Sequence, residues 1–200
     1  MASVRPRSQT NGKYEAILRA AIKVFSRSGF FNSKVADVAR EAGVADGTVY
    51  LYFKNKDDIL VSIFNHVMDE ALALGRKRLE EVGDPVQKLK QIVQAHLDML
   101  GRDRDLAVVF QVELRSSSKF MEQFSATKVT EYLDLIRGVI EEGQKKGVFR
   151  RGLNTTIAAK VLFGALDEMA TNWVLSRKRY VLVSTAEPLI DLLMNGIAGD

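Results

Sequence analysis

Apolar residues recur along almost the whole chain at spacings of three and four, which is the period of an amphipathic α-helix. The first clear stripe ends at Ser28-Gly29 and consists of Ile17, Ala20, Ala21, Val24 and Phe25. No stretch alternates apolar and polar residues in the manner of a half-buried strand. The pattern therefore predicts an all-α fold of about nine helices, three short ones followed by six longer ones.

Two short helices are expected directly after this stripe. Ser33 is a good N-cap for the first of them, and Gly43 tolerates the left-handed backbone of the turn that closes it. The next helix is expected from about Asp46 to Tyr52. Two short helices joined by a tight turn predict a helix-turn-helix, in which the second helix enters the major groove of DNA.

The remaining chain predicts longer helices. Asn55 can cap a helix that runs to about Glu81, and Asp84-Pro85 can start the next one, because proline is tolerated at the first helical position. Later helical segments are expected at 103–118, 121–146, 153–178 and 184–198. We expect a helix-turn-helix DNA-binding domain at 1–54 and a larger helical effector-binding and dimerisation domain at 55–200.

The distribution of charge separates the two parts. Residues 1–60 carry ten Lys or Arg and six Asp or Glu, whereas the other 140 residues carry nineteen of each. A basic N-terminal third on a neutral body is typical of a small nucleic-acid module joined to another domain, although an excess of four charges can also arise by chance.

Composition excludes several other classes of protein. Cysteine is absent, which excludes disulfides, thiolate catalysis and thiolate metal sites. No apolar run approaches the roughly 20 residues of a membrane span. His66 and His96 lie on separate predicted helices, and no glycine-rich phosphate loop or catalytic constellation is present. We expect a cytoplasmic protein with no cofactor, metal site, catalytic residues or membrane partner.

The segment from Val38 to Lys56, VAREAGVADGTVYLYFKNK, closely resembles the TetR family of one-component transcriptional regulators. Ala45 departs from the pattern, because many members have Ser or Thr there as the cap of the recognition helix. The resemblance implies a set of DNA-contacting residues: Ser33, Lys34, Ala45, Gly47, Thr48, Tyr50, Tyr52 and Lys54.

Within this set the resemblance implies two roles. The expected phosphate contacts are Ser33, Lys34, Tyr52 and Lys54. Gly47 and Thr48 are expected to lie nearest the groove, with Tyr50 partly against bases and partly against the backbone. Aromatic packing between the short helices is the alternative for Tyr50 and Tyr52. For Leu51 and Phe53 we favour packing, because a small three-helix unit needs apolar anchors.

The segments Phe110–Arg115 and Phe163–Val174 resemble the fatty-acid-degradation repressors of the same family, which bind long-chain acyl-CoA and release DNA. An acyl tail needs a long apolar tunnel, and flexible methionines suit ligands of varying length. An ordinary core position is the alternative for each apolar candidate. The candidate ligand residues are Met68, Leu72, Met99, Val109, Phe110, Glu113, Arg115, Tyr132, Ile136, Phe163, Leu166, Asp167, Met169 and Trp173.

Charged residues also interrupt the apolar helices of this part. Arg115 is expected to pair with Glu113 or Asp167. The pair is expected to be either a polar girdle that orients the ligand or couples the pocket to the DNA-binding domain, or a structural ion pair between helices. Candidate cations for a phosphate-bearing head group at the cavity mouth are Arg76, Lys77, Arg78, Arg102, Arg104 and Arg177–Arg179.

The last two helices carry more apolar surface than one thin bundle can bury, and by resemblance they form a homodimer interface. The apolar residues concerned are Val161, Ala165, Leu189, Leu192, Leu193 and Ile197. Two recognition helices about 34 Å apart would then meet a palindromic double-stranded operator.

Taken as a whole, the sequence predicts a dimeric repressor released by long-chain acyl-CoA, which would derepress fatty-acid degradation genes. A repressor that answers to another hydrophobic compound, such as a drug or an aromatic metabolite, is the alternative. A helical enzyme or lipid carrier that has kept a DNA-binding-like N-terminus is a rival from another class. Operator sequence, regulated genes and acyl chain length stay open at this point.

Overall fold

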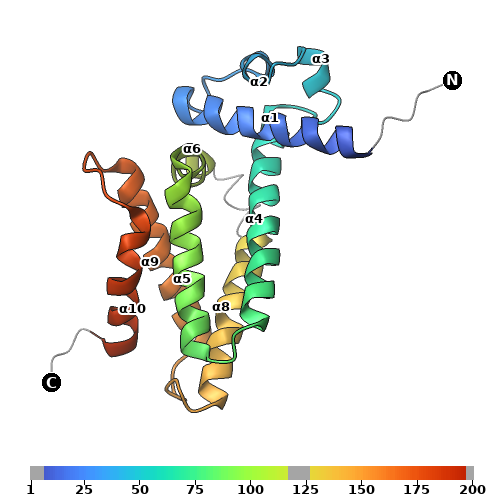
Figure 1. Cartoon of the computed structure of the whole chain (residues 1–200). Coiled ribbons are helices and arrows are strands. Elements are labelled where there is room, and N and C mark those ends of the chain that lie inside the picture. Colours follow the sequence, from blue (N-terminus) through green and yellow to red (C-terminus); the bar gives the residue numbers. More distant parts are fainter. Residues whose placement is uncertain (1–6, 117–126, 197–200) are drawn as a thin grey trace.

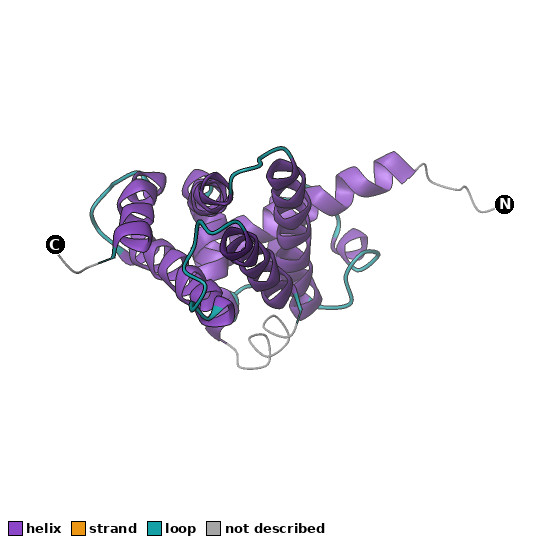
Figure 2. Cartoon of the chain, turned by 90° about the horizontal axis from the view of Figure 1, so that it is seen from below, coloured by secondary structure: helices purple, strands orange, loops and turns teal. Residues whose placement is uncertain are grey.

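The computed structural model describes residues 7–116 and 127–196. Every regular element within those ranges is helical, nine of them α-helices, which confirms the all-α prediction (Figure 2). Helix α1 (Arg7–Ser28) lies across the upper ends of the long helices, with α2 (Val35–Glu41) and α3 (Asp46–Val49) beside it (Figure 1). The prediction of a short first helix is wrong, because α1 has 22 residues. Its N-terminal turns are polar, so they carry no apolar stripe from which their helical structure could be predicted.

The first helix ends as predicted, but the second begins differently. Gly29 and Gly43 have positive φ values of 78° and 67°, so both helix ends use the conformation that glycine tolerates. Ser33 is not the N-cap of α2; Lys34 is, and its backbone N–H donates to Asp37 Oδ2 at 2.9 Å. The Ser33 hydroxyl is buried and donates to the Gly29 carbonyl at 2.6 Å.

The N-terminal unit and the larger bundle share one hydrophobic core. Buried residues of the first three helices pack against Ile59, Leu60 and Ile63 on α4 (Lys56–Glu80). Leu106 and Val109, from much later in the chain, belong to the same core. The predicted division after residue 54 remains a prediction, since α4 contributes to both parts.

The local signals at the ends of α4 and α5 (Pro85–Arg102) are confirmed. Asn55 Oδ1 accepts from the Asp58 backbone N–H at 2.8 Å. Asp84 caps α5 by accepting from the backbone N–H groups of its second and third residues, with Pro85 in the first position. A short polar side chain therefore fixes where each of these two helices begins.

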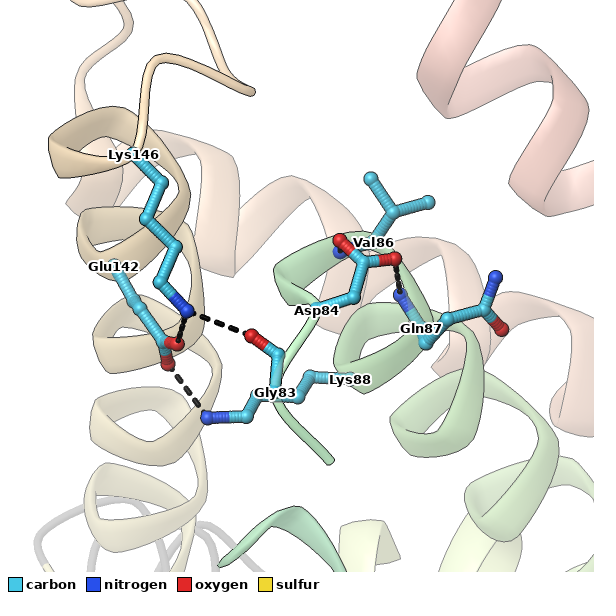
Figure 3. Close-up of polar contacts among 7 residues, drawn as sticks. All are labelled: Gly83, Asp84, Val86, Gln87, Lys88, Glu142 and Lys146. Carbon is cyan, nitrogen blue, oxygen red and sulfur yellow. Dashed lines mark hydrogen bonds and ion pairs between the residues drawn. The ribbon is translucent and has the colours of Figure 1, made fainter. Parts of the chain in front are cut away.

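An ion-pair cluster (Figure 3) lies at the turn between α4 and α5, which is at the lower end of the bundle in Figure 1. Lys146 Nζ donates to the Gly83 carbonyl at 2.6 Å and to Glu142 Oε1 at 2.7 Å, and Lys88 Nζ donates to Glu142 Oε2 at 2.7 Å. Hydrogen bonds from the two ammonium groups lower the pKa of Glu142. The cluster fastens the turn between α4 and α5 to the end of α8 (Lys128–Lys145).

The predicted helix at 103–118 is three elements of different pitch. They are α6 (Arg104–Val108), the π-helix η1 (Val109–Glu113) and the 3₁₀ turn η2 (Leu114–Ser116). Part of this prediction, like residues 121–126 of the following one, lies outside the described residues. A π-helix inside a helical segment often marks a functional site, and periodicity in the sequence does not reveal it.

The C-terminal helices are shorter than predicted. Asn154 caps α9 (Thr155–Leu175), and Arg104 donates to the Val174 carbonyl at 2.8 Å near its end. The last predicted helix divides into η3 (Leu182–Thr185) and α10 (Ala186–Asn195). Together with α5 and α8 these elements enclose the second hydrophobic core. Among the helices described, none is long and apolar enough to cross a membrane.

Candidate DNA interface and effector cavity

The recognition segment offers an exposed surface around α3. Ala45, Gly47, Tyr50 and Lys54 are exposed, and Thr48 is partly so. A Cβ atom at Gly47 would meet no other atom within 4 Å, so its surroundings are open. These predicted positions therefore lie on one accessible face at the end of the molecule away from the ion-pair cluster (Figure 1).

The two predicted apolar anchors of this segment have opposite outcomes. Phe53 is 2% exposed and packs in the core, whereas Leu51 is 68% exposed, so its assignment as an anchor is wrong. The reason is that α3 ends at Val49, and Val49 and Phe53 are the residues that face inward. Leu51 thus adds an apolar side chain to the accessible surface.

Two other predicted contacts lie in mixed surroundings. The half-buried Tyr52 ring lies 6.3 Å from the ring of Tyr14 and 6.4 Å from that of Phe53, which is the packing alternative. Tyr50, by contrast, is 57% exposed. Ser33 is buried with its hydroxyl committed to the backbone, so it is not displayed for phosphate as expected, whereas Lys34 is exposed.

Lys56 is a residue whose role the sequence did not reveal. Its Nζ donates to the carbonyl oxygens of Phe30 at 2.7 Å and of Ser33 at 2.8 Å, and it lies 4.5 Å above the Phe30 ring. The first turn of α4 therefore holds the connection between α1 and α2. Its position directly before two aspartates made it resemble an ordinary surface lysine.

A cavity of about 640 Å³ lies among α4, α5, α8, α9 and the η1 segment. Apolar side chains dominate its wall, with Leu74 half exposed at the surface of α4. Seven of the fourteen predicted ligand residues line it: Met68, Met99, Phe110, Arg115, Tyr132, Phe163 and Asp167. A cavity of this size falls within the roughly 300–1,000 Å³ of small-molecule sites.

The structure does not bring the other seven predicted ligand residues to the cavity wall. Five pack in or against the two cores: Val109, Ile136, Leu166, Met169 and Trp173. A sixth, Leu72, is buried on α4. The seventh, Glu113, faces α1. Only part of the apolar face of a helix borders a cavity, and the rest packs in the core. Periodicity alone therefore cannot separate lining residues from core residues.

The cavity has a polar side built on α5 and α8. His96 Nδ1 lies 3.1 Å from the Tyr132 hydroxyl, and the Phe163 ring contacts both side chains. Burial lowers the pKa of His96 to about 4, an effect that the negative charge of Asp167 opposes, and burial raises the pKa of Tyr132. Both groups are therefore uncharged at neutral pH. The sequence did not indicate this role, since His96 is one of two histidines on separate predicted helices.

An ion pair adds to this polar side. Arg115 pairs with Asp167, which confirms one of the two expected partners. Gln111 is buried in the same wall and accepts a hydrogen bond from the Thr171 hydroxyl at 2.9 Å. Among the described residues, no group of His, Cys, Asp and Glu could hold a metal ion.

The other expected partner, Glu113, connects the two parts of the molecule. Its Oε2 accepts from the Phe30 backbone N–H at 2.7 Å, across 83 positions in the chain. Ser26, on α1, donates to Asp105 Oδ1, on α6, at 2.8 Å. The end of α1 is thus hydrogen-bonded to the helical segment that lines the cavity.

Some of the predicted mouth cations lie at the cavity and others do not. Arg78 and Arg102 contribute to its wall, and Arg102 also pairs with Asp98 at 2.7 Å. Arg104 is elsewhere, because its guanidinium lies 4.8 Å above the Trp173 ring at the end of α9. Arg76, Lys77 and Arg177–Arg179 do not line the cavity, and Arg76 pairs with Glu131 on α8.

Comparison with protein families matches both parts of the chain. Residues 17–63 match the model described as bacterial regulatory proteins, tetR family, and residues 64–196 match the YsiA-like protein, C-terminal region. The fatty acid metabolism regulator protein of Bacillus subtilis is 36% identical over 189 residues, which cover 94% of this chain and 97% of that protein.

Solved structures agree with this assignment. The transcriptional regulator FadR from Bacillus subtilis, in complex with stearoyl-CoA, is 35% identical with a TM-score of 0.88, and the match covers 92% of this chain and all of that one. The fatty acid degradation regulator FadR from Bacillus halodurans is 38% identical, with the same TM-score and coverage. The chain therefore belongs to the TetR family of bacterial transcriptional regulators.

Proposed function

We propose that this protein is a dimeric repressor that binds a palindromic operator, is released by long-chain acyl-CoA and thereby derepresses genes of fatty-acid degradation. The observation that carries the proposal is the largely apolar cavity, which shares its wall with a helical segment bonded to the DNA-binding unit. The similar FadR structure holds stearoyl-CoA, which is the class of ligand that such a cavity suits.

The cavity wall supports an acyl chain on physical grounds. Burial of apolar ligand surface contributes roughly 25 cal/mol per Å², so a long alkyl chain gains most of its affinity from walls of this kind. Met68 and Met99 supply flexible side chains that adapt to chains of different length. Arg78 and Arg102 provide positive charge where the wall reaches the surface of α4 and α5.

The DNA contacts that we propose are those that α3 and its flanks expose. Gly47 and Thr48 would approach the groove, Tyr50 would contact bases and backbone, and Lys54 would contact phosphate. Lys34, Ala45 and the Tyr52 hydroxyl complete this face. The exposed Leu51 is an addition to the expected set, since an apolar side chain can contact a thymine methyl group.

A dimer would form through α9 and α10. Val161 and Leu192, which the sequence predicted for this interface, are 57% and 45% exposed, and Ile157, one turn before Val161 on α9, is also exposed. Leu189 is buried within its own chain and would not contribute, and Ile197 lies outside the described residues. Exposed apolar patches of this kind typically mark an interface.

Operator binding followed by fluorescence anisotropy tests the proposal. The labelled duplex comes from upstream of the protein's own gene, and lauroyl-, palmitoyl- and oleoyl-CoA are titrated beside free fatty acids and free CoA. Release by acyl-CoA at low micromolar concentration, but not by CoA or a detergent, is the expected result. Tight DNA binding that is indifferent to all of them would refute the acyl-CoA assignment and would direct the search to other apolar effectors.

A further inference from the structure

Two polar atoms in the cavity wall are buried without a hydrogen-bond partner. They are His96 Nε2 and Gln91 Oε1, and both residues belong to the cavity lining on α5. A buried polar group without a partner costs about 1–3 kcal/mol, which is why such groups are rare in folded proteins. Polar atoms of this kind in the wall of a largely apolar cavity indicate a polar group on the ligand.

The Tyr132 hydroxyl determines what His96 can offer. A neutral imidazole has one N–H donor and one acceptor nitrogen, and the hydrogen bond at Nδ1 decides which is which. Nδ1 lies 3.1 Å from the Tyr132 hydroxyl, and either group can donate across that distance. The arrangement that leaves no O–H proton unpaired has the hydroxyl donating to Nδ1, which places the ring proton on Nε2. The ring contact of Tyr132 with Phe163, at 6.0 Å between centroids, holds this geometry.

The surroundings of His96 favour an uncharged acceptor on the ligand. The Arg115 guanidinium is already paired with Asp167, and burial keeps the imidazole neutral. A fatty-acid carboxylate placed against His96 would be a buried charge that the neutral imidazole does not balance, which is expensive. A carbonyl oxygen accepts the same hydrogen bond without that cost.

We propose that the Tyr132 hydroxyl donates to His96 Nδ1, and that His96 donates its Nε2–H to the carbonyl oxygen of an acyl thioester and so makes the cavity specific for thioesters. This inference rests on the proposed function, because it assumes that the ligand is an acyl-CoA. It adds a reason for selectivity that the apolar wall cannot supply, since alkyl chains of an acid, a thioether and a thioester bury the same surface. A site built to donate a hydrogen bond discriminates against an analogue that lacks the acceptor.

The test compares palmitoyl-CoA with S-hexadecyl-CoA, a thioether of the same chain length that lacks the carbonyl oxygen. Dissociation constants are measured by isothermal titration calorimetry on the full chain. Wild type should bind the thioether about tenfold more weakly, which is the effect of one lost neutral hydrogen bond with its buried donor left unsatisfied. His96→Leu should bind both compounds alike, and Tyr132→Phe, which keeps the ring, should lose much of the preference.

His66→Leu is the matched control, because His66 lies on α4, does not line the cavity and forms a contact with Glu70 at 3.5 Å. This variant should retain the tenfold preference. Equal binding of thioester and thioether by wild type would overturn the role of His96 and leave the proposed function intact. Failure of both compounds to bind would refute the proposed function itself.

The tautomer is tested separately by ¹⁵N NMR, since the chain has only two histidines. We expect a neutral His96 with the proton on Nε2 at pH 7, and a shift of that proton on addition of the thioester but not of the thioether. A proton on Nδ1 would contradict the proposal. An equal shift with both ligands would indicate an ordered water as the partner of Nε2 and would also overturn it.

Discussion

Removal of the Glu113 carboxylate should weaken the coupling between effector and operator. The carboxylate accepts from the Phe30 N–H at 2.7 Å, and Phe30 itself is buried. A hydrogen bond to a charged group contributes about 1.5–3 kcal/mol and a neutral one about 1 kcal/mol. Glu113→Ala should therefore remove about 2 kcal/mol of interaction free energy between Glu113 and the Phe30 N–H, and Glu113→Gln about 1 kcal/mol.

These magnitudes convert into a change that binding assays resolve. Effector coupling typically amounts to 1–3 kcal/mol, so Glu113→Ala could abolish most of it, and Glu113→Gln should reduce the effector-induced change in operator affinity about fivefold. Operator dissociation constants are measured by fluorescence anisotropy with and without saturating palmitoyl-CoA. Coupling is reciprocal, so DNA should affect palmitoyl-CoA affinity by the same reduced factor.

Glu142→Gln provides the matched control for this experiment. Glu142 is also a hydrogen-bonded carboxylate, but it lies in the ion-pair cluster at the opposite end of the bundle (Figure 3). Its substitution should lower stability and leave coupling unchanged. If Glu113→Ala lowered stability to a similar extent and kept the full effector response, Glu113 would be a structural residue and the reasoning would be wrong.

Three further predictions concern DNA binding and stability. Gly47→Leu should abolish specific operator binding while circular dichroism remains that of the wild type, because a Cβ atom there meets no other atom within 4 Å and Gly47 is exposed. Normal operator binding would contradict the groove assignment. The pKa of His96 is about 4 in the folded chain and 6.5 when unperturbed. Between these values the unfolded chain takes up a proton that the folded chain does not. The free energy of unfolding should therefore fall by about 3 kcal/mol as the pH drops from 7 to 4. In thermal unfolding between pH 7 and 4.5, His96→Leu should lose less stability than wild type. Equal loss of stability with pH in both proteins would exclude His96 as the cause. Gly143→Ala would place a Cβ atom 2.0 Å from the Phe149 ring, so it should destabilise the chain by about 1–3 kcal/mol in urea unfolding, and an unchanged midpoint would mean that Phe149 moves aside freely.

Local signals in the sequence predicted the fold well because they act within one turn of helix. The caps at Asn55 and Asp84 bond backbone groups two or three residues away, and Gly29 ends α1 through its own φ angle. The predictions for Ser33 and Leu51 were wrong for a different reason. Their surroundings depend on how short segments turn relative to the core, which neighbouring residues do not determine.

The candidate site was only partly predictable. Phe110 and Arg115 were expected at the cavity because their segment resembles a known subgroup, and they line it. His96 and Gln91 were missed, since a single polar residue in an apolar stripe resembles a satisfied core residue. Their unpartnered atoms become visible only when the opposing helices are in position. The bond between Glu113 and Phe30 joins residues 83 positions apart, and no local pattern encodes it.

The Phe30 peptide lies where the two halves of the proposed switch meet. Its N–H is held by Glu113 on η1, and its carbonyl is held by Lys56 on α4 at 2.7 Å. Lys56 also binds the Ser33 carbonyl, directly before α2. Any shift of η1 relative to α4 must therefore be taken up in the connection at 29–34, which leads into the two helices of the DNA-binding motif. Phe110 and Arg115, which line the cavity, lie three and two residues from Glu113 in the same helical segment. A ligand in the cavity would therefore contact residues within one helical turn of the group that holds this connection, and no longer coupling path is required.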